Sequence, residues 1–413
     1  MANPRATLLV DILVEHLEEL EFLWGQRRSA LDDTDYLYIK FLHLEERIEA
    51  HVEGLLVEEK SLTEMLAGGL SAAGSSSAFA SAYPLLRLKT TEAANLVFDA
   101  FKSAKGGTLA GLTQALCHGP IATVLPLIRD ASKAEGPIAL AALEVLAFQS
   151  PEDCGAEGLA PFMQHEDVEL RRGCWELAAK LKTPLVAGRY KKALEDPEML
   201  VRRAGYRAAA WGKQAWLPDH CRTILQSPKS RDLDALHVLA VLGKPEDLVF
   251  LRDPRWSSLP STAWFATLAT FGHPGVIPEL VKGMENANPR LAVAAGQAFS
   301  RLTGCSVASE KRAALPPENG ETPSDFEKEF LDEAFLPDPA KARSYVKINK
   351  DALTKGSRWH LGRELSRETA RSLLDLVDVP MRQDTCLRAR FEGRWPVGLA
   401  DLERFPQKMT DGE

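Results

Sequence analysis

The stretch DPEMLVRRAGYRAAAWG, residues 196–212, decides the fold because similar stretches recur on both sides of it. EDVELRRGCWELAAKL occupies residues 166–181, and NPRLAVAAGQAFSRLTG occupies residues 288–304. Each begins with Asp or Asn in a turn and continues through Arg into a run of Ala and large apolar residues. Self-similarity with a period of tens of residues is typical of stacked helical pairs. The sequence therefore predicts an all-α fold, a HEAT-like α-solenoid.

The repeat length supports this prediction. When the second helix of each pair is aligned, the starts are separated by 31, 29, 35, 30 and 27 residues. About 30 residues is enough for two short helices and two turns. The predicted second helices start near Gly136, Asp167, Asp196, Arg231, Ser261 and Asn288.

Composition divides the chain into four parts. Residues 1–70 are expected to form an N-terminal helical hairpin, interrupted at Gly25 and by the polar residues 29–35. Residues 71–307 would hold the repeats, and the small residues 72–77 would form a flexible linker or a loop. Residues 308–322, rich in Pro and Gly, are expected to be a linker, and residues 323–413 a small capping region. Strands are not expected in the repeats, because alternating β-branched runs are absent.

The bulk composition indicates a soluble protein. The chain has 413 residues, a formal net charge of −8 and six cysteines with no CxxC pair. Scattered cysteines beside Ala, Leu or Trp behave as small apolar residues. The first residues do not resemble a secretory leader, and no apolar run reaches the roughly 20 residues of a membrane span. These features predict a cytoplasmic protein with no membrane partner.

Charge is unevenly distributed. Residues 1–64 contain 15 acidic against 6 basic side chains, whereas residues 171–231 contain 14 basic against 5 acidic ones. Such asymmetry can orient a partner. Arginines near helix starts would also produce it simply by facing solvent.

The N-terminal hairpin contains a distinctive set of residues: His16, Glu19, Phe22-Leu23-Trp24, Arg27 or Arg28, Leu44, Arg47, Ala50-His51 and Gly54-Leu55. With these residues it resembles the opening of an uncharacterised family of bacterial HEAT-repeat proteins. Residues 288–304 are similar to the family's last repeat. Members are often encoded beside type VI secretion spike genes, so the resemblance implies a genomic setting. It implies no catalytic residues.

Candidate catalytic chemistry is weak. His43 and His51 lie two helical turns apart, about 12 Å, so one metal ion could not bridge them without His16 and a carboxylate. We expect His16 and His51 to pack between helices instead. The adjacent His220 and Cys221 point about 100° apart on a helix and do not form a nucleophile pair. We therefore expect no catalytic residue, no metal site and no cofactor.

Partner binding is the favoured role. The sequence places basic and aromatic residues together in the central repeats, and we assign partner contacts to Arg171, Arg172, Arg202, Arg203, Arg207, Trp175 and Trp211. A basic groove with aromatics would also suit duplex DNA, as in HEAT-like DNA glycosylases. Nucleic acid is the less favoured partner, because the N-terminal hairpin is acidic and paired arginines belong to the repeat pattern.

The function expected is a non-enzymatic protein-protein interaction scaffold. In the setting that the resemblance implies, it would be an adaptor or chaperone-like loading factor for a type VI secretion spike or effector. An immunity protein against a secreted toxin is a further alternative. No small-molecule substrate is indicated. The sequence does not choose among the protein partners.

Overall fold

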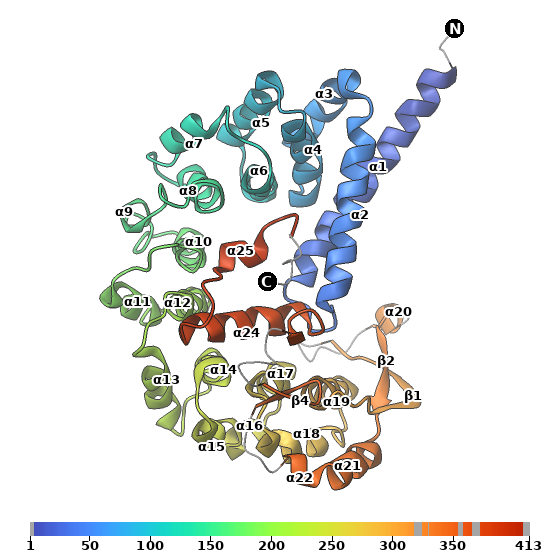
Figure 1. Cartoon of the computed structure of the whole chain (residues 1–413), viewed down its shortest axis with the longest axis vertical. Coiled ribbons are helices and arrows are strands. Elements are labelled where there is room, and N and C mark those ends of the chain that lie inside the picture. Colours follow the sequence, from blue (N-terminus) through green and yellow to red (C-terminus); the bar gives the residue numbers. More distant parts are fainter. Residues whose placement is uncertain (1–3, 318–323, 329, 354–357, 366–371, 408–413) are drawn as a thin grey trace. The chain divides into compact units, whose positions relative to one another are not determined.

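The computed structural model describes residues 4–317, 324–328, 330–353, 358–365 and 372–407, and it is mostly helical (Figure 1). None of the helices within these ranges is long and apolar enough to cross a membrane. The chain divides into two compact units. Unit 1 consists of residues 1–214 together with 378–413, and unit 2 consists of residues 215–377. The partition differs from the expected domains, because the division lies within the repeats and the C-terminal residues join the N-terminal unit.

Unit 1 consists of the helices of the N-terminal half of the chain and two helices from its C-terminal region. They are α1 (Pro4–Ala30), α2 (Tyr38–Leu56), α3 (Glu59–Ala67), η1 (Gly68–Ser71), α4 (Ser75–Arg87), α5 (Thr91–Ser103), α6 (Gly106–His118), α7 (Leu125–Ala131), α8 (Pro137–Gln149), α9 (Ala156–Leu159), α10 (Val168–Ala178), α11 (Ala187–Leu194), α12 (Met199–Trp211), α24 (Val379–Phe391) and α25 (Leu399–Glu403).

The predicted hairpin of α1 and α2 is present, and the two helices pack against each other. The buried side of α1 includes Leu20, Leu23 and Trp24. The predicted interruption at Gly25 is wrong, because α1 continues through it to Ala30. A glycine lowers helix stability only modestly, and packing of the surrounding apolar stripe outweighs that cost.

The second helices of successive pairs in unit 1 stack in chain order, with α4 against α6, α6 against α8, α8 against α10 and α10 against α12. The stretch 72–77 is not simply a loop, because α4 begins at Ser75 and is buried from Ala78 onward. Its small residues allow close approach. A Cβ built on Gly111 of α6 would lie 2.1 Å from the carbonyl oxygen of Ser75, so the glycine permits this contact.

Unit 2 contains short helices and two small sheets. Its elements are α13 (Leu217–Gln226), α14 (Leu233–Leu242), η2 (Pro245–Asp247), α15 (Leu248–Leu251), α16 (Pro254–Ser257), α17 (Thr262–Phe271), η3 (Pro274–Val276), α18 (Ile277–Gly283), α19 (Pro289–Thr303), β1 (Ala308–Ala314), α20 (Asp325–Lys328), β2 (Glu333–Pro337), α21 (Pro339–Ile348), α22 (Lys350–Leu353), β3 (Trp359–His360) and β4 (Arg363–Glu364). Helices α14, α17 and α19 stack in order.

Capping side chains confirm four of the six predicted starts of second helices. The side chains of Asp167 and Asn288 each accept a hydrogen bond from the amide two residues later. Ser261 caps α17 through the amide of Trp264, and Asp232 caps α14 one residue after the predicted start. Caps of this kind satisfy amides that the first helical turn leaves unpaired. The repeat pattern therefore located the helix starts within a few residues.

The predicted linker 308–322 is wrong in its first half. Strand β1 covers residues 308–314 and pairs antiparallel with β2, with Ala308 opposite Pro337 and Ala314 opposite Glu333. Residues 318–322 of that linker lie outside the described part of the chain. The strand was missed because its sequence, ASEKRAA, is charged and mostly exposed rather than β-branched.

Candidate binding pocket

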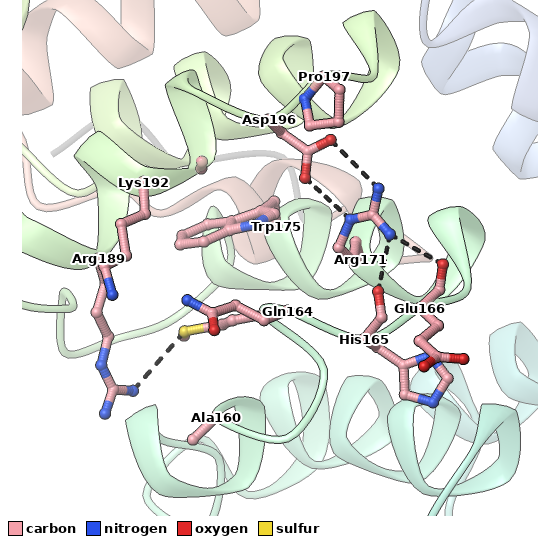
Figure 2. Close-up of a pocket in the computed structure, with 12 residues that line it drawn as sticks. Ala160, Gln164, His165, Glu166, Arg171, Trp175, Arg189, Lys192, Asp196 and Pro197 are labelled. Carbon is pink, nitrogen blue, oxygen red and sulfur yellow. Dashed lines mark hydrogen bonds and ion pairs between the residues drawn. The ribbon is translucent and has the colours of Figure 1, made fainter.

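A cavity of about 530 Å³ opens between two consecutive helical pairs of unit 1 (Figure 2). Its walls come from the segment after α9, the first turns of α10, helix α11 and the turn before α12. The lining residues are Ala160, Met163, Gln164, His165, Glu166, Arg171, Trp175, Arg189, Lys192, Ala193, Asp196 and Pro197. A volume of this size lies within the range of ligand pockets.

One wall is held together by Arg171. Its guanidinium donates to both carboxylate oxygens of Asp196 at 2.9 and 3.3 Å. The same side chain donates to the carbonyl oxygens of His165 at 2.7 Å and Glu166 at 3.0 Å. Figure 2 shows these four bonds converging on one side of the cavity. Arg171 therefore fixes the turn before α10 to the turn before α12.

The charged forms of Arg171 and Asp196 are stabilised by their contacts with each other. Burial on its own would raise the pKa of Asp196, but hydrogen bonds from Arg171 and from the amide of Glu198 lower it below its ordinary value. The hydrogen bond to Asp196 raises the pKa of Arg171. Both groups stay ionised near neutral pH. The wall is thus suited to a fixed binding surface rather than to proton transfer.

The floor of the cavity is apolar. The indole ring of Trp175 lies between the Arg171 wall and the side occupied by Arg189 and Lys192 (Figure 2). Trp175 is only 2% exposed, and its ring contacts that of Tyr190 at 6.0 Å between centroids. An apolar side chain entering the cavity would meet this ring edge, and burying apolar area contributes about 25 cal/mol per Å².

The opposite wall is cationic. Arg189 donates to the carbonyl oxygen of Ala156 at 2.9 Å and approaches the sulfur of Met163 at 3.8 Å. Lys192, one turn later on α11, is exposed and lines the same cavity. Glu166 supplies an exposed carboxylate on the far side. The rim therefore offers opposite charges on its two sides.

The structure brings only two of the seven predicted contact residues, Arg171 and Trp175, to this cavity. Arg172 pairs instead with Glu169 at 2.5 Å and with Glu176 at 3.6 Å on its own helix. Arg202 donates to the carbonyl oxygens of Asp196 and Pro197, both at 2.7 Å, in the manner of Arg171 one repeat earlier. Arg203 is exposed on α12.

Arg207 and Trp211 of α12 lie near the C-terminal helices instead. Arg207 forms an ion pair with Glu403 at 3.2 Å, and the backbone carbonyl of Trp211 accepts from Arg390 at 3.0 Å. Trp211 is 4% exposed. The Trp211 ring is therefore buried in the core of unit 1, whereas the nearly buried Trp175 lines the floor of the cavity.

Arg189 and Lys192 were not among the predicted contact residues, although both stand out as basic residues in the sequence. Their positions four (Lys192) and seven (Arg189) residues before the acidic turn at Asp196 were the available signal. Arg189 and Lys192 share a cavity with His165 only because successive helical pairs stack on each other. Helix periodicity in the sequence does not predict how these pairs stack.

The N-terminal histidines pair with each other. Nδ1 of His16 and Nδ1 of His51 are 3.0 Å apart, and the rings meet edge to face. A Cβ on Gly54 would collide with the His16 ring at 2.6 Å, so this glycine makes room for it. Within the described residues, no three His, Cys, Asp or Glu side chains are arranged to hold a metal ion.

No protein-family model and no curated protein matches this chain. Among solved structures, the chain is similar to the X-ray structure of YibA from Escherichia coli. The two are 16% identical, and the match covers 59% of this chain and 96% of YibA with a TM-score of 0.39.

Proposed function

We propose that this chain is a non-enzymatic interaction scaffold whose stacked pairs are HEAT-like solenoid repeats. The observation that carries the proposal is the cavity between the turns at His165 and Pro197, which two successive pairs build together. Repeat proteins use the surfaces shared by neighbouring repeats to bind extended partners. The ion pair of Arg171 and Asp196 preorganises this surface, and preorganisation lowers the entropy cost of binding.

The chemistry of the cavity describes the partner segment. An apolar side chain would enter toward Trp175, where Met163, Ala160 and Ala193 supply further apolar area. An acidic residue beside it would face Arg189 and Lys192. The proposed ligand is therefore an extended protein segment with an apolar anchor next to Asp or Glu.

The resemblance of the N-terminal hairpin extends the proposal to a biological setting. The chain would act as an adaptor or loading factor for a type VI secretion spike or a secreted effector. Holding the partner in an extended, accessible form is a role that a preformed surface can perform without chemistry.

The proposal is tested by affinity capture from the native cell, followed by mass spectrometry, with a variant that reverses the cationic wall. We expect wild type to retain a spike or effector protein, and Arg189→Glu with Lys192→Glu to lose it. Lys133→Glu, two residues after the end of α7, is the matched control, because its side chain is 74% exposed and distant in sequence from the cavity. Equal retention by the double variant and wild type would reject the pocket as the binding site.

Duplex DNA is the weaker alternative for a structural reason. Arg171 is paired with Asp196, Arg172 with Glu169 and Glu176, and Arg207 with Glu403. Cations already paired with carboxylates contribute less to binding phosphates, since binding then requires those pairs to break. A protein that grips DNA would shift a duplex at low salt and lose it steeply as salt rises.

A further inference from the structure

The C-terminal segment, residues 399–407, is bound in unit 1 by side chains from much earlier in the chain. Figure 1 shows α25 and the residues after it inside the row of helices from α4 to α12. The contacts join positions as far as 377 residues apart. We call the side chains that hold the segment the receiving face: Trp24, Arg27, Glu45, Tyr83, His118, Lys180 and Arg207.

The main chain of the segment is recognised by side chains. Arg27 donates to the carbonyl oxygens of Glu403 at 3.2 Å and Arg404 at 3.1 Å. The amide of Phe405 donates to Nδ1 of His118 at 3.3 Å, and the amide of Gln407 donates to Glu45 at 2.7 Å. Recognition of backbone groups by fixed side chains is how proteins bind extended peptides without adding a strand.

One aromatic residue anchors the segment. Phe405 is 2% exposed, and its ring lies 5.4 Å from Trp24, 5.5 Å from Tyr83 and 6.3 Å from His118 between centroids. The guanidinium of Arg27 lies 5.3 Å from the same ring. Edge-to-face rings and a cation over an aromatic face are specific for an aromatic ligand.

One acidic residue adds charge recognition. Glu403 pairs with Lys180 at 3.0 Å and with Arg207 at 3.2 Å. Burial would raise the pKa of this carboxyl, but Lys180 and Arg207 lower it below its ordinary value. The receiving face therefore distinguishes an acidic residue two positions before the phenylalanine.

The receiving face has internal structure of its own. Arg27 and Glu45 form an ion pair at 2.7 Å in which both side chains are nearly fully buried. Trp24 stacks on Phe79 and donates to Gln114 at 2.7 Å. These contacts do not involve the C-terminal segment, so they can hold the site when the segment leaves.

The segment also has internal structure. Nε2 of Gln407 donates to the carbonyl oxygens of Asp401 at 3.1 Å, Leu402 at 3.0 Å and Arg404 at 2.7 Å. These hydrogen bonds hold residues 401–407 in a compact turn. The segment therefore has the properties of a short, preorganised ligand attached by the loop at Gly393 and Gly398.

We infer that the receiving face is a peptide-binding site for segments of the pattern acidic-x-Phe, and that residues 403–405 of this chain fill it as an internal competitor. The partner is a protein that carries the same pattern in an extended segment. An attached ligand acts at an effective concentration on the order of 1 mM, so a free segment with an intrinsic Kd of about 10 µM would bind about 100-fold more weakly. The partner site stays closed until a competitor is abundant or multivalent.

The test measures binding of a fluorescent peptide with the sequence of residues 399–407 to the full chain by anisotropy. Phe405→Ala weakens the internal competitor and should tighten peptide binding at least tenfold relative to wild type. A peptide with Ala in place of its Phe should not bind either protein. In the Phe405→Ala background, Arg207→Glu should weaken binding about tenfold, whereas Lys133→Glu should leave it unchanged.

Glu403→Lys is a second variant for the same binding measurement. It removes the ion pairs of the internal segment with Lys180 and Arg207 and leaves Phe405 in place. It should also tighten peptide binding. If both variants fold as judged by circular dichroism and neither binds the peptide at 1 mM, the segment is only a structural part of unit 1. This result would leave the pocket near Trp175 untouched, since that pocket shares no residue with the receiving face.

Discussion

Arg171 donates two hydrogen bonds to the carboxylate of Asp196, 25 residues later, at 2.9 and 3.3 Å. Arg222 binds Asp247 in unit 2 over the same interval, at 2.7 and 2.8 Å. Each pair joins one helical pair to the turn of the next. The interval is slightly shorter than the 27 to 35 residues between the predicted helix starts, and Arg171 and Arg222 both join neighbouring helical pairs.

Replacing Asp196 with Ala should lower the free energy of unfolding by about 2 kcal/mol, because it leaves a largely buried guanidinium without its charged partner. The two side chains are only 13% and 11% exposed. Thermal or urea unfolding followed by circular dichroism measures the change. Asp219→Ala is the control, since Asp219 pairs with Arg222 while 82% exposed. It should cost less than about 0.5 kcal/mol. Equal losses would show that the Arg171 pair is no more than a surface contact.

Filling the cavity should block the partner without unfolding the chain. Ala160 is exposed and lines the cavity, so Ala160→Trp would occupy space beside Trp175. We expect partner affinity to fall at least tenfold, about 1.4 kcal/mol. Ala187→Trp, at an exposed position of α11 that does not line the cavity, should retain the partner. Retention by both variants in the same capture assay would argue against the pocket.

Acid should weaken unit 1 through His118. Burial and the charges of Arg27, Arg404 and Lys180 lower the pKa of His118 well below its ordinary value of about 6.5. As the pH falls below about 6.5, His118 is therefore protonated in the unfolded chain but stays neutral in the folded chain. The stabilisation from neutral His118 is complete above about pH 6.5 and declines as the pH falls, by up to about 1.4 kcal/mol per pH unit.

His118→Asn keeps an acceptor for the amide of Phe405 but cannot be protonated. Unfolding free energies measured for both proteins at pH 7.5, 6.5 and 5.5 should show a smaller acid-dependent loss for the variant. Parallel curves would mean that His118 is protonated in the folded chain.

The close contact of α4 with α6 depends on the absence of a Cβ atom at Gly111. A Cβ at Gly111 would lie 2.1 Å from the oxygen of Ser75 and 2.9 Å from Ala78, so Gly111→Ala must push the helices apart. We expect a loss of about 1–3 kcal/mol. Gly188→Ala is the matched control on α11, where a Cβ would meet nothing within 4 Å. It should be neutral or stabilising by up to about 1 kcal/mol, measured by the same urea titration.

Local signals in the sequence predicted the helices but not the placement of their side chains. Asp167, Ser261 and Asn288 could be identified as helix starts, because a capping side chain acts on amides two or three residues away. The role of Arg171 required knowledge that residue 196 lies beside it, which follows only when the repeat is built in three dimensions.

The contacts of the C-terminal segment are the clearest example of structure that the sequence pattern does not predict. Glu403 and Phe405 appear in a charged stretch with weak periodicity. Their partners Trp24 on α1, His118 on α6 and Lys180 just after α10 lie hundreds of residues earlier. No periodic pattern links such positions. Similarly, β1 is held by pairing with β2 rather than by the strand preference of its own residues.

The discontinuity of unit 1 affects the order in which the chain can fold during synthesis. Unit 2 is one continuous stretch, so it can fold as soon as residue 377 has left the ribosome. The helices of unit 1 are made earlier, but the site beside Trp24 stays unfilled until Phe405 has been made. Until then, the newly made N-terminal half exposes an unfilled aromatic site, which chaperones could bind before the final residues arrive.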